Sequence, residues 1–577
     1  MSLSIFLLWL LCIPLSVHPL PAPRGFQLNC GASEDITHGN LKFIPDKGFI
    51  SVGNKSAIKT ADVLPVLSTL RFFPDTSAKK YCYVLPVIKG GKYLVRTTYY
   101  YGGYDGGEEP PVFDQIIQGT KWSTVNTTED YANGMSSYYE IIVASLAKTL
   151  SVCLARNVHT TSSPFISALE IEYLGNSVYN STDFSKYALV TVARDNFGAD
   201  EEIIGKTSEN ILETSDGEYV KTIEPSFPDD QFNRLWQPFI DQNPVVECQN
   251  NVSSSEFWNF PPQRAFASAI TTSRGKTIKI QWPPVSLPST KYYIALYFQD
   301  NRTPSPYSWR VFSVSINGQN FYKDLNVTAN GVTVYGSEWP LSGQTEITLT
   351  PGNNIPVGPV INAGEIYHIL PLGGRTLTRD GSPLLPSYDH LFVEVMAMEN
   401  LARRFVNPPS DWSGDPCLPP ENSWTGVKCS QDKLARVVAL NLTSMGISGS
   451  LHSSLANLTA VAHIWLGGNK LSGSIPNLSK LKELQTLHLE NNKLEGTIPQ
   501  SLGQLGQLRE LFLQNNNLDG RVPDSLRNKK GLNIQQYSID FIAANKGVSW
   551  ESSIFLSKQN ANGEPRRGAQ QVFPSPL

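Results

Sequence analysis

A leucine repeat of almost constant period, between residues 433 and 527, is the feature that most constrains the fold of this chain. Each copy follows the pattern Leu-x-Leu-x-x-Asn-x-Leu-x-Gly-x-x-Pro, and the positions equivalent to the asparagine are Met445, Asn469, Asn492 and Asn516. The copies are therefore spaced by 24, 23 and 24 residues. This period fits one strand and one return segment per turn, with leucines inside and asparagines laddering along the backbone. The pattern predicts a solenoid of four repeats, and Met445 marks an atypical first one.

The side chains that alternate with the leucines on these strands form columns, one repeat apart, on one face of the solenoid. One column holds Trp465, His488 and Phe512, and the column beside it holds Glu490 and Gln514. Exposed aromatic side chains tend to mark interfaces. We interpret these five residues as concave-face candidates for binding a partner receptor or a peptide. The alternative is an incidental column that glycans shield.

The stretch Asp411–Cys429 is where the chain changes architecture. It contains two cysteines twelve positions apart, Cys417 and Cys429, and two tryptophans beside them, Trp412 and Trp424. The first turn of a solenoid has no neighbour to cover its core, so it needs a cap. We predict that a disulfide between these cysteines and an apolar plate of the two indole rings form that cap.

The chain before the cap has the composition and patterning of β-sandwiches. Charged residues make up 17% and aromatic residues 10%, with 43 glycines and 40 prolines, which favours turn-rich β structure over helical bundles. The β-branched and aromatic run Lys92–Tyr101 ends at Gly-Gly and Asp-Gly pairs, as a strand that enters a tight loop does. Further short strands follow at sandwich spacing.

Four motifs in this region carry a resemblance to a known family. They are Cys-Tyr-Val-Leu-Pro-Val at Cys82–Val87, Tyr-Gly-Gly-Tyr-Asp-Gly at Tyr101–Gly106, Pro-Val-Phe-Asp at Pro111–Asp114 and Pro-Phe-Ile-Ser-Ala-Leu-Glu at Pro164–Glu170. With them the chain resembles the malectin-like ectodomain of plant receptor-like kinases and receptor-like proteins. A second copy follows, in which Lys291–Phe298 repeats the long strand and Ile361–Tyr367 matches the family's Asn-Ala-x-Glu strand.

The resemblance extends to the rest of the chain. Gly-Asp-Pro-Cys at Gly414–Cys417 resembles the junction of the same family, and the Leu-x-Gly-x-Ile-Pro part of the repeat resembles the plant extracellular class of leucine-rich repeats. We therefore expect an all-β pair of tandem malectin-like β-sandwiches followed by an α/β-type leucine-rich repeat solenoid. The predicted division is signal peptide 1–22, lobe 1 at 23–200, lobe 2 at 201–405, cap 406–432, four repeats at 433–527 and an irregular tail 528–577.

A carbohydrate site is the sharper functional hypothesis for lobe 1. Sugars present hydroxyl edges and apolar faces, so a receptor site needs an aromatic platform with a carboxylate beside it. Tyr99, Tyr101, Tyr104 and Asp105 supply these types on a strand end and its loop. The alternative is that alternate tyrosines pack in the sandwich and the loop merely forms a turn.

Comparison with animal malectin weakens one version of this hypothesis. Its adjacent aromatic pair falls near Gly103 and Tyr104, so one aromatic residue is kept, and its sugar-binding aspartate falls near Ser162, so the carboxylate is lost. In lobe 2 the aromatic pair falls at Asn301 and Arg302. We therefore do not expect the diglucosylated glycan that animal malectin binds as the ligand, and another wall polysaccharide stays open as an alternative.

Several features indicate secretion. The apolar run Ser4–Leu15 has the length of a signal peptide, and its removal leaves six cysteines, an even count that suits disulfides. Beyond Cys417 and Cys429, the pairing of the other four is left open, and one or more can be free; they are Cys30, Cys82, Cys153 and Cys248. Nine glycosylation sequons agree with the secretory route; they begin at Asn54, Asn126, Asn180, Asn251, Asn301, Asn326, Asn441, Asn457 and Asn477.

No apolar run long enough to cross a bilayer follows the leader, so we expect no membrane span in this sequence. The expected location is secreted, in the cell wall, or the plasma membrane if a full-length form carries a C-terminal transmembrane helix. The segment Gly381–Glu394 breaks the family pattern and is either a natural loop or an in-frame intron left in a gene model; we favour the second.

Chemistry-bearing motifs are missing from the sequence. It has no nucleophile elbow, no metal-ligand spacing and no kinase signature set, and its net charge of -4 provides no basic footprint for nucleic acid. We expect no enzyme, no catalytic residues, no cofactor and no metal. The predicted function is recognition, with cell-wall carbohydrate or a secreted peptide bound by the malectin-like region and a receptor-kinase co-receptor or peptide bound by the repeats. The alternatives are a structural wall-associated protein and a carbohydrate-active enzyme.

Overall fold

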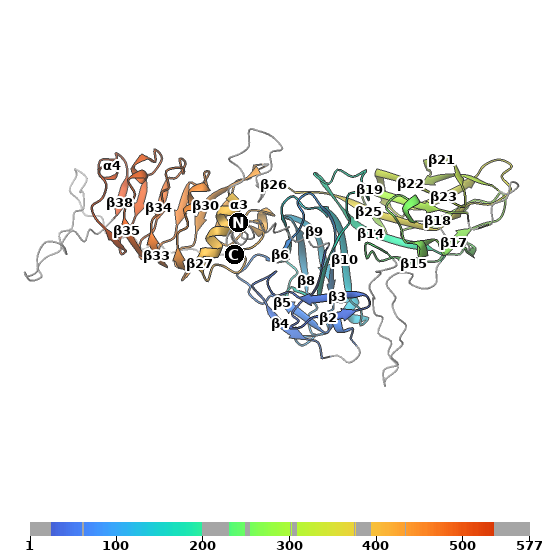
Figure 1. Cartoon of the computed structure of the whole chain (residues 1–577), viewed down its shortest axis with the longest axis horizontal. Helices are drawn as coiled ribbons and strands as arrows, with labels where there is room; N and C mark the ends of the chain where they lie inside the picture. The colour runs from blue at the N-terminus through green and yellow to red at the C-terminus, as the bar shows by residue number, and fades with distance from the viewer. Residues whose placement is uncertain are drawn as a thin grey trace, which may run out of the picture.

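The computed structural model describes residues 25–59, 63–198, 230–248, 254–300, 302, 309–373, 375–376, 394–432 and 434–535. Its architecture is mostly β, as predicted, with three bodies arranged in a row (Figure 1). The solenoid lies at one end, lobe 1 (residues 25–198) lies in the middle and lobe 2 (residues 230–373) lies at the other end. The predicted leader, residues 381–393, the sequons at Asn251 and Asn301 and the tail beyond residue 535 lie outside the described residues.

The two lobes share one large sheet. Strand β14 pairs with β10 of lobe 1 along one side and with β25 of lobe 2 along the other. The sheet order is β2-β3-β1-β13-β7-β10-β14-β25-β19-β22, and β15 also pairs with β14. The predicted tandem sandwiches are therefore joined edge to edge. The strands of this sheet are β1 Gly25–Asn29, β2 Ile36–His38, β3 Leu41–Pro45, β7 Lys92–Tyr99, β10 Ser137–Ala144, β13 Ala168–Tyr173, β14 Tyr187–Phe197, β15 Gln237–Phe239, β19 Leu287–Phe298, β22 Val332–Gly343 and β25 Ala363–Pro371.

A second sheet covers each half of the large one and encloses a core. In lobe 1 its order is β6-β11-β8-β9, and in lobe 2 its order is β18-β23-β20-β21. The eight residues of β7 are all buried, which explains why this strand reads as a continuous β-branched and aromatic run. The strands are β6 Tyr81–Pro86, β8 Val112–Ile117, β9 Thr120–Asn126, β11 Thr149–Arg156, β18 Ile278–Gln281, β20 Arg310–Ile316, β21 Gln319–Val327 and β23 Glu346–Pro351.

Smaller elements complete the lobes. Short sheets form from β4 Asn54–Ala57, β5 Thr69–Phe72 and β12 Phe165–Ile166, and from β16 Val245–Glu247, β17 Ser268–Thr271 and β24 Val360–Ile361. The helical turns are η1 Pro65–Leu67, α2 Thr128–Ala132, η2 Ser254–Glu256 and η3 Gln263–Phe266.

The solenoid forms as the repeat predicts. Its strands β30, β32, β34, β36 and β38 run parallel, and the antiparallel β28 begins the sheet. The asparagine ladder is present: Asn469 Oδ1 accepts from the Ile447 amide at 3.0 Å, and Asn469 Nδ2 donates to the Leu442 carbonyl at 2.8 Å. The bounds are β28 Val427–Cys429, β30 Val437–Asn441, β32 His463–Trp465, β34 Thr486–His488, β36 Glu510–Phe512 and β38 Asn533–Gln535.

The repeat array extends further than predicted. Strand β38 adds a fifth parallel strand inside residues 528–577, which the sequence analysis assigned to an irregular tail. Without the full leucine pattern, this turn relies on pairing with β36, so sequence periodicity does not reveal it. The return side carries β27 Phe405–Val406, β31 Ser448–Ser450, β33 Lys470–Ser474, β35 Lys493–Thr497 and β37 Asn517–Asp519, with η5 Ser453–Asn457, η6 Gln500–Gln504 and α4 Asp524–Arg527.

The cap has the predicted construction. A disulfide joins Cys417 to Cys429, and the rings of Trp412 and Trp424 stack at 5.3 Å and are buried. Each indole N–H donates to a cap carbonyl at 2.9 Å, so the rings are core residues and not ligand contacts. The cap also contains η4 Pro420–Asn422, and the pair β26 Arg375–Thr376 and β29 Leu434–Ala435 lies beside it.

The helix α3 Glu394–Arg404 belongs to the solenoid by packing. Its buried residues Ala397, Met398 and Leu401 lie in one core cluster with the repeat leucines. The predicted boundary of lobe 2 at residue 405 is therefore wrong on packing grounds. An amphipathic helix buries its apolar face against whichever neighbour is present, and the sequence does not say which one that is.

Lobe 1 and the cap are packed together. Lys80 of lobe 1 is buried, and its Nζ donates to the carbonyls of Asp415 and Leu418, both at 2.6 Å. Asp411 Oδ2 accepts from the Lys79 amide at 3.2 Å. Burial lowers the pKa of Lys80 to about 8. A cut before Asp411 would expose this buried interface, so variants of the whole chain are better probes than fragments.

Of the four remaining cysteines, two form a disulfide and two are free thiols. Cys82 and Cys153, which face each other on β6 and β11, form a disulfide, while Cys30 and Cys248 are free. Burial raises the pKa of the Cys30 thiol far above its usual value, so it is an inert core residue.

Candidate recognition surfaces

The tyrosine loop of lobe 1 does not form the predicted carbohydrate platform. Tyr99 and Tyr101 are 1% and 2% exposed, so their rings belong to the sandwich core. Tyr104 is half-buried, and its hydroxyl donates to the Ser163 carbonyl at 3.3 Å. The hydroxyls of Tyr101 and Ser162 both donate to the Asp105 carboxylate. The rings of Tyr99 and Tyr101 are covered and the polar atoms of the loop bond to one another, so these four residues present no open aromatic platform.

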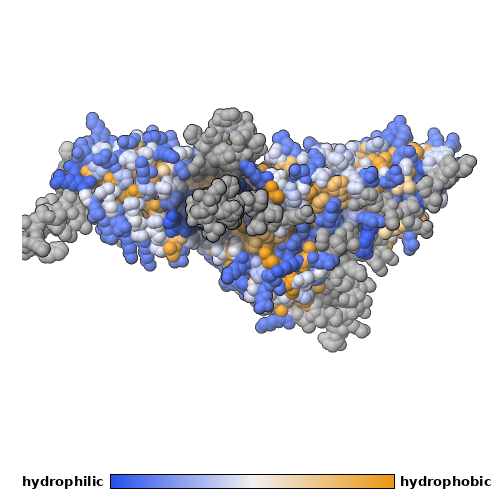
Figure 2. Space-filling model, in the orientation of Figure 1, coloured by the Kyte–Doolittle hydropathy of each residue, from blue (hydrophilic) through white to orange (hydrophobic). Residues whose placement is uncertain are grey.

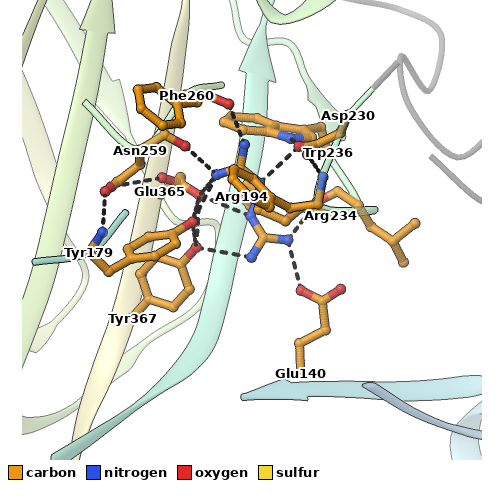
Figure 3. A network of polar contacts seen from close by, with 12 residues as sticks. Glu140, Tyr179, Arg194, Asp230, Arg234, Trp236, Asn259, Phe260, Glu365 and Tyr367 are labelled. Atoms are coloured by element: carbon orange, nitrogen blue, oxygen red, sulfur yellow. Dashed lines mark hydrogen bonds and ion pairs between the residues drawn. The ribbon is translucent and has the colours of Figure 1, made fainter. Parts of the chain in front are cut away.

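A buried network of charges fixes the junction between the lobes (Figure 3). Arg194 of β14 donates to Glu140 of lobe 1 at 2.7 Å and to Glu365 of lobe 2 at 3.0 Å. Two further N–H groups donate to the Leu235 carbonyl at 3.0 Å and the Tyr367 hydroxyl at 2.9 Å. One guanidinium therefore ties together residues of both lobes.

Two further arginines extend this network. Arg96 bonds to Glu140 at 2.6 Å and to Glu170 at 3.1 Å. Arg234 bonds to Asp230 at 2.8 Å, as Figure 3 also shows. All of these side chains are at most 9% exposed, so each charge is balanced by an opposite charge of the protein and not by water.

The arginines determine the ionisation of the buried acids. Burial alone raises a carboxyl pKa, but Arg194 and Arg96 outweigh it and hold the pKa of Glu140 below its usual value. Arg234 and Arg194 do the same for Glu365. Sequence analysis did not find this network. The available signal was an arginine within each of two apolar strands, Lys92–Tyr99 and Tyr187–Phe197.

A cleft of about 330 Å³ opens beside this network, between the lobes. It lies where β14 changes partner, because Val190 is paired with β10 and Asp195 is paired with β15, with a bulge between Thr191 and Ala193. Bulges often lie beside functional sites. The lining comprises Trp122, Tyr138, Tyr139, Glu140, Val190, Thr191, Val192, Ala193, Arg194, Asp195, Leu235, Gln237, Pro238, Phe239, Pro283, Pro284 and Val285.

Two polar groups in this lining lack partners. The indole nitrogen of Trp122, which is 6% exposed, and the hydroxyl of Thr191 are buried without a hydrogen bond to any described residue. A buried, unpaired donor costs about 1–3 kcal/mol, so such groups are rare in native proteins unless a partner forms a hydrogen bond with them.

Figure 2 shows larger apolar, orange patches over the lobes than over the solenoid in this view.

Asp195 makes the stability of this junction depend on pH. Burial raises its pKa to about 7, although Trp282 donates to it at 2.5 Å. The folded pKa lies above the unfolded value, so the folded state binds more protons, and stability falls as pH rises from about 4 through 7. Glu172, whose pKa burial raises to about 7, contributes in the same direction.

We predict that Asp195→Asn removes part of this pH dependence. One titrating group changes the free energy of unfolding by at most about 1.4 kcal/mol per pH unit, so this is the largest slope that the variant can remove. Asparagine keeps an acceptor for the Trp282 N–H but does not titrate. Calorimetric unfolding of the variant and the wild type at pH 5 and pH 7.5 measures the effect. A variant that loses as much stability with rising pH as the wild type contradicts the assignment.

The concave-face candidates lie together as predicted. Trp465, His488 and Phe512 occupy one register across β32, β34 and β36, and all three are partly exposed. The His488 and Phe512 rings stack at 4.1 Å, and Trp465 stacks on His463 at 5.0 Å. The face therefore carries two stacked ring pairs in neighbouring register, His463 with Trp465 and His488 with Phe512.

Acidic and amide groups flank these rings. Glu490 lies over Gly467, where an added Cβ would approach Glu490 Oε1 to 2.2 Å, so glycine leaves room for the carboxylate. His488 Nε2 lies 3.3 Å from Glu510 Oε2. Buried atoms without a hydrogen bond to the described residues occur here too, namely His488 Nε2, Glu490 Oε2 and Gln514 Oε1. This surface therefore combines partly exposed aromatic rings with carboxylate and amide groups beside them.

Most of the described sequons are accessible. Asn441 is exposed on β30 and pairs in register with Trp465, so a glycan there would border the aromatic rings. Asn457 is partly buried, and the other exposed ones are Asn54, Asn126, Asn180, Asn326 and Asn477. In the part of the chain that the structure describes, no helix is long and apolar enough to span a bilayer, and no group of three His, Cys, Asp or Glu side chains could hold a metal ion.

Comparisons with known proteins agree with this architecture. The malectin-like domain model matches residues 28–369, and the leucine-rich repeat model matches residues 483–505 and 507–529. A probable leucine-rich repeat receptor-like serine/threonine-protein kinase of Arabidopsis thaliana is 28% identical over 520 residues, which cover 83% of this chain and 49% of that protein. The similar kinase PAM74 of the same plant is 29% identical over 455 residues, covering 75% and 46%.

The chain spans about half the length of the curated relatives it matches. Among solved structures, the ANX2 ectodomain from Arabidopsis thaliana aligns with a TM-score of 0.46 and 17% identity, over 60% of this chain and 96% of that one. Because the malectin-like model covers more than half of the sequence, this chain belongs to the malectin-like domain family, as a receptor-like member with leucine-rich repeats.

Proposed function

We propose that this protein is an extracellular recognition protein of the receptor type, whose repeats bind a partner receptor or a secreted peptide. The observation that carries the proposal is the row of partly exposed rings of Trp465, His488 and Phe512 in one register, in which His488 stacks on Phe512 and Trp465 stacks on His463. Preformed ring faces contribute contact area with little loss of side-chain entropy, which is why aromatic residues dominate the centres of interfaces.

The flanking charges favour a basic partner segment. Glu490 and Glu510 lie beside the ring faces, and an arginine or lysine of a partner could stack on a ring while it approaches a carboxylate. For the malectin-like region, the proposal is that it binds cell-wall carbohydrate or a peptide. A purely structural wall protein is the second candidate, although the stacked rings favour a specific partner over it.

We predict that the double variant Trp465→Ala, Phe512→Ala lowers affinity for the partner by at least about 2 kcal/mol, as expected for hot-spot residues. The test is a pairwise binding screen of the whole chain against purified receptor-kinase ectodomains and synthetic secreted peptides. The matched control is Tyr322→Ala, which removes an aromatic residue that is 47% exposed on lobe 2.

Two outcomes would count against the proposal. One is that every partner found binds the double variant as tightly as the wild type. The other is that Tyr322→Ala weakens binding by the same amount, since the effect would then not belong to the concave face.

A further inference from the structure

We propose that the cleft between the lobes binds a short, uncharged oligosaccharide and discriminates against acidic sugars. This inference deepens the recognition role proposed above for the malectin-like region, and rests on it. It places the site at the partner change of β14, on residues other than the tyrosine loop of lobe 1. The cleft exists because two lobes share one sheet, so a single sandwich would not have it.

The shape of the cleft suits a small, rigid ligand. Its volume of about 330 Å³ is near the lower end of the range for ligand pockets, which favours a few sugar rings over a folded peptide. Rings line it from both sides: Trp122 and Tyr139 come from β9 and β10 of lobe 1, and Phe239 comes from β15. Sugars stack their apolar C–H faces on such rings.

Polar groups between these rings can bind hydroxyls. Gln237 is partly exposed, and its Nε2 donates to the Tyr138 hydroxyl at 3.0 Å, which leaves the amide oxygen as an acceptor. Trp122 Nε1 and Thr191 Oγ1 belong to residues that line the cleft, and both atoms are buried without partners among the described residues. Ligand hydroxyls that reach them would remove the cost of burying unpaired donors.

The charges of the cleft select against an acidic ligand. Arg194 is the cation of this lining, and four of its five N–H donors are bonded, to Glu365, Glu140, Leu235 and Tyr367. Because Arg194 is already paired with Glu140 and Glu365, a uronate would lose its hydration without gaining an unpaired cation.

A cationic ligand fits no better. Both oxygens of Glu140 are bonded to arginines, and Asp195 accepts from Trp282 and titrates near neutral pH because it is buried. An uncharged ligand is the one that the available groups match.

The cleft is also preorganised. The buried bonds from Arg194 to both lobes hold its walls at a fixed separation. Binding then costs little conformational entropy of the protein, which favours an uncharged ligand that gains no ion pair.

Titration calorimetry of the whole protein tests this with chemically defined probes. The neutral probes are cello-oligosaccharides and xylo-oligosaccharides, and the acidic probe is an oligogalacturonide of equal length. We expect at least one neutral probe to bind and the oligogalacturonide to bind at least tenfold more weakly.

Variants locate the site. Gln237→Ala and Val285→Arg, at a partly exposed and an exposed position of the cleft, should each weaken neutral-sugar binding at least tenfold with an unchanged melting temperature. Trp122→Ala should abolish it, but this ring is buried, so the surface variants carry the test. The matched control, Asp105→Asn in the tyrosine loop, should bind as the wild type does.

Four results would overturn the proposal: no binding of any neutral probe at millimolar concentration, preferential binding of the oligogalacturonide, neutral-sugar binding that survives both surface variants, or a peptide that requires Gln237 while sugars do not bind. None of these affects the concave-face variants. Failure of the cleft and failure of the partner-binding role are therefore distinguishable.

Discussion

Arg194→Met is expected to destabilise the junction between the lobes by about 3–5 kcal/mol, because it leaves the buried charges of Glu140 and Glu365 without their shared partner. Both carboxylates are at most 1% exposed, so water cannot replace the guanidinium. Methionine has a similar length but no charge and no donors. The expected result is a separate, lower-temperature unfolding transition for the two lobes in calorimetry.

A surface ion pair is the matched control for this variant. Lys291 bonds to Glu338 at 2.5 Å, but the two side chains are 62% and 52% exposed. Lys291→Met should leave unfolding unchanged, because water and salt already screen the pair. If Arg194→Met unfolds like Lys291→Met, the network does not hold the lobes together.

Cys417→Ser is expected to cost about 2–5 kcal/mol in the cap, the usual range for loss of a native disulfide. The bond holds β28 against the first repeat strand, since Cys429 lies on β28, which pairs with β30. Without the disulfide, the two stacked indole rings are no longer held in place over the solenoid core. The loss of stability should therefore extend into the first turns of the solenoid. Hydrogen exchange should increase in Val427–Asn441 and remain unchanged in lobe 2.

The free cysteine Cys248 provides the control for this variant. It lies in lobe 2 and is partly buried as a free thiol, so Cys248→Ser makes the same residue replacement without breaking a disulfide. Unchanged protection of Val427–Asn441 in Cys417→Ser would refute the capping role. Equal effects of both variants would attribute the loss to thiol chemistry in general.

The solenoid could be predicted almost completely from the sequence, because its physics is periodic. Each leucine is required at a fixed spacing to fill the core, and each asparagine is required to bond the turn, so position alone assigns the role. Trp412 and Trp424 could be placed in the cap by the same logic. The strand β38 was missed because pairing with a neighbour can form a turn without the leucine pattern.

The packing of the tyrosine loop in lobe 1 could not be predicted in this way. Alternation says that Tyr99 and Tyr101 share one face of a strand, but it does not say whether a second sheet covers that face. Here the sheet that contains β8 covers it, and Tyr99 contacts Phe113 with ring centroids 5.4 Å apart. A run of tyrosines therefore indicated aromatic packing and not a platform.

The cleft depends on long-range register, which local sequence patterns do not encode. Trp122 and Gln237 lie far apart in sequence, and they line one cleft because β14 exchanges β10 for β15. Arg96 and Arg194 could be recognised locally, because a charged residue in the middle of an apolar strand needs a buried partner of opposite charge. The sequence pattern therefore predicts a buried ion pair, but it does not show where in the chain the partner lies.

A hydrogen-exchange footprint of the whole chain with a partner from the binding screen tests the recognition account most directly. The account predicts added protection in β32, β34 and β36, where the backbone carries Trp465, His488 and Phe512. It predicts no change in the return strands β33 and β35. Protection confined to those return strands, or to the lobes alone, would contradict the assignment of the concave face as the partner-binding surface.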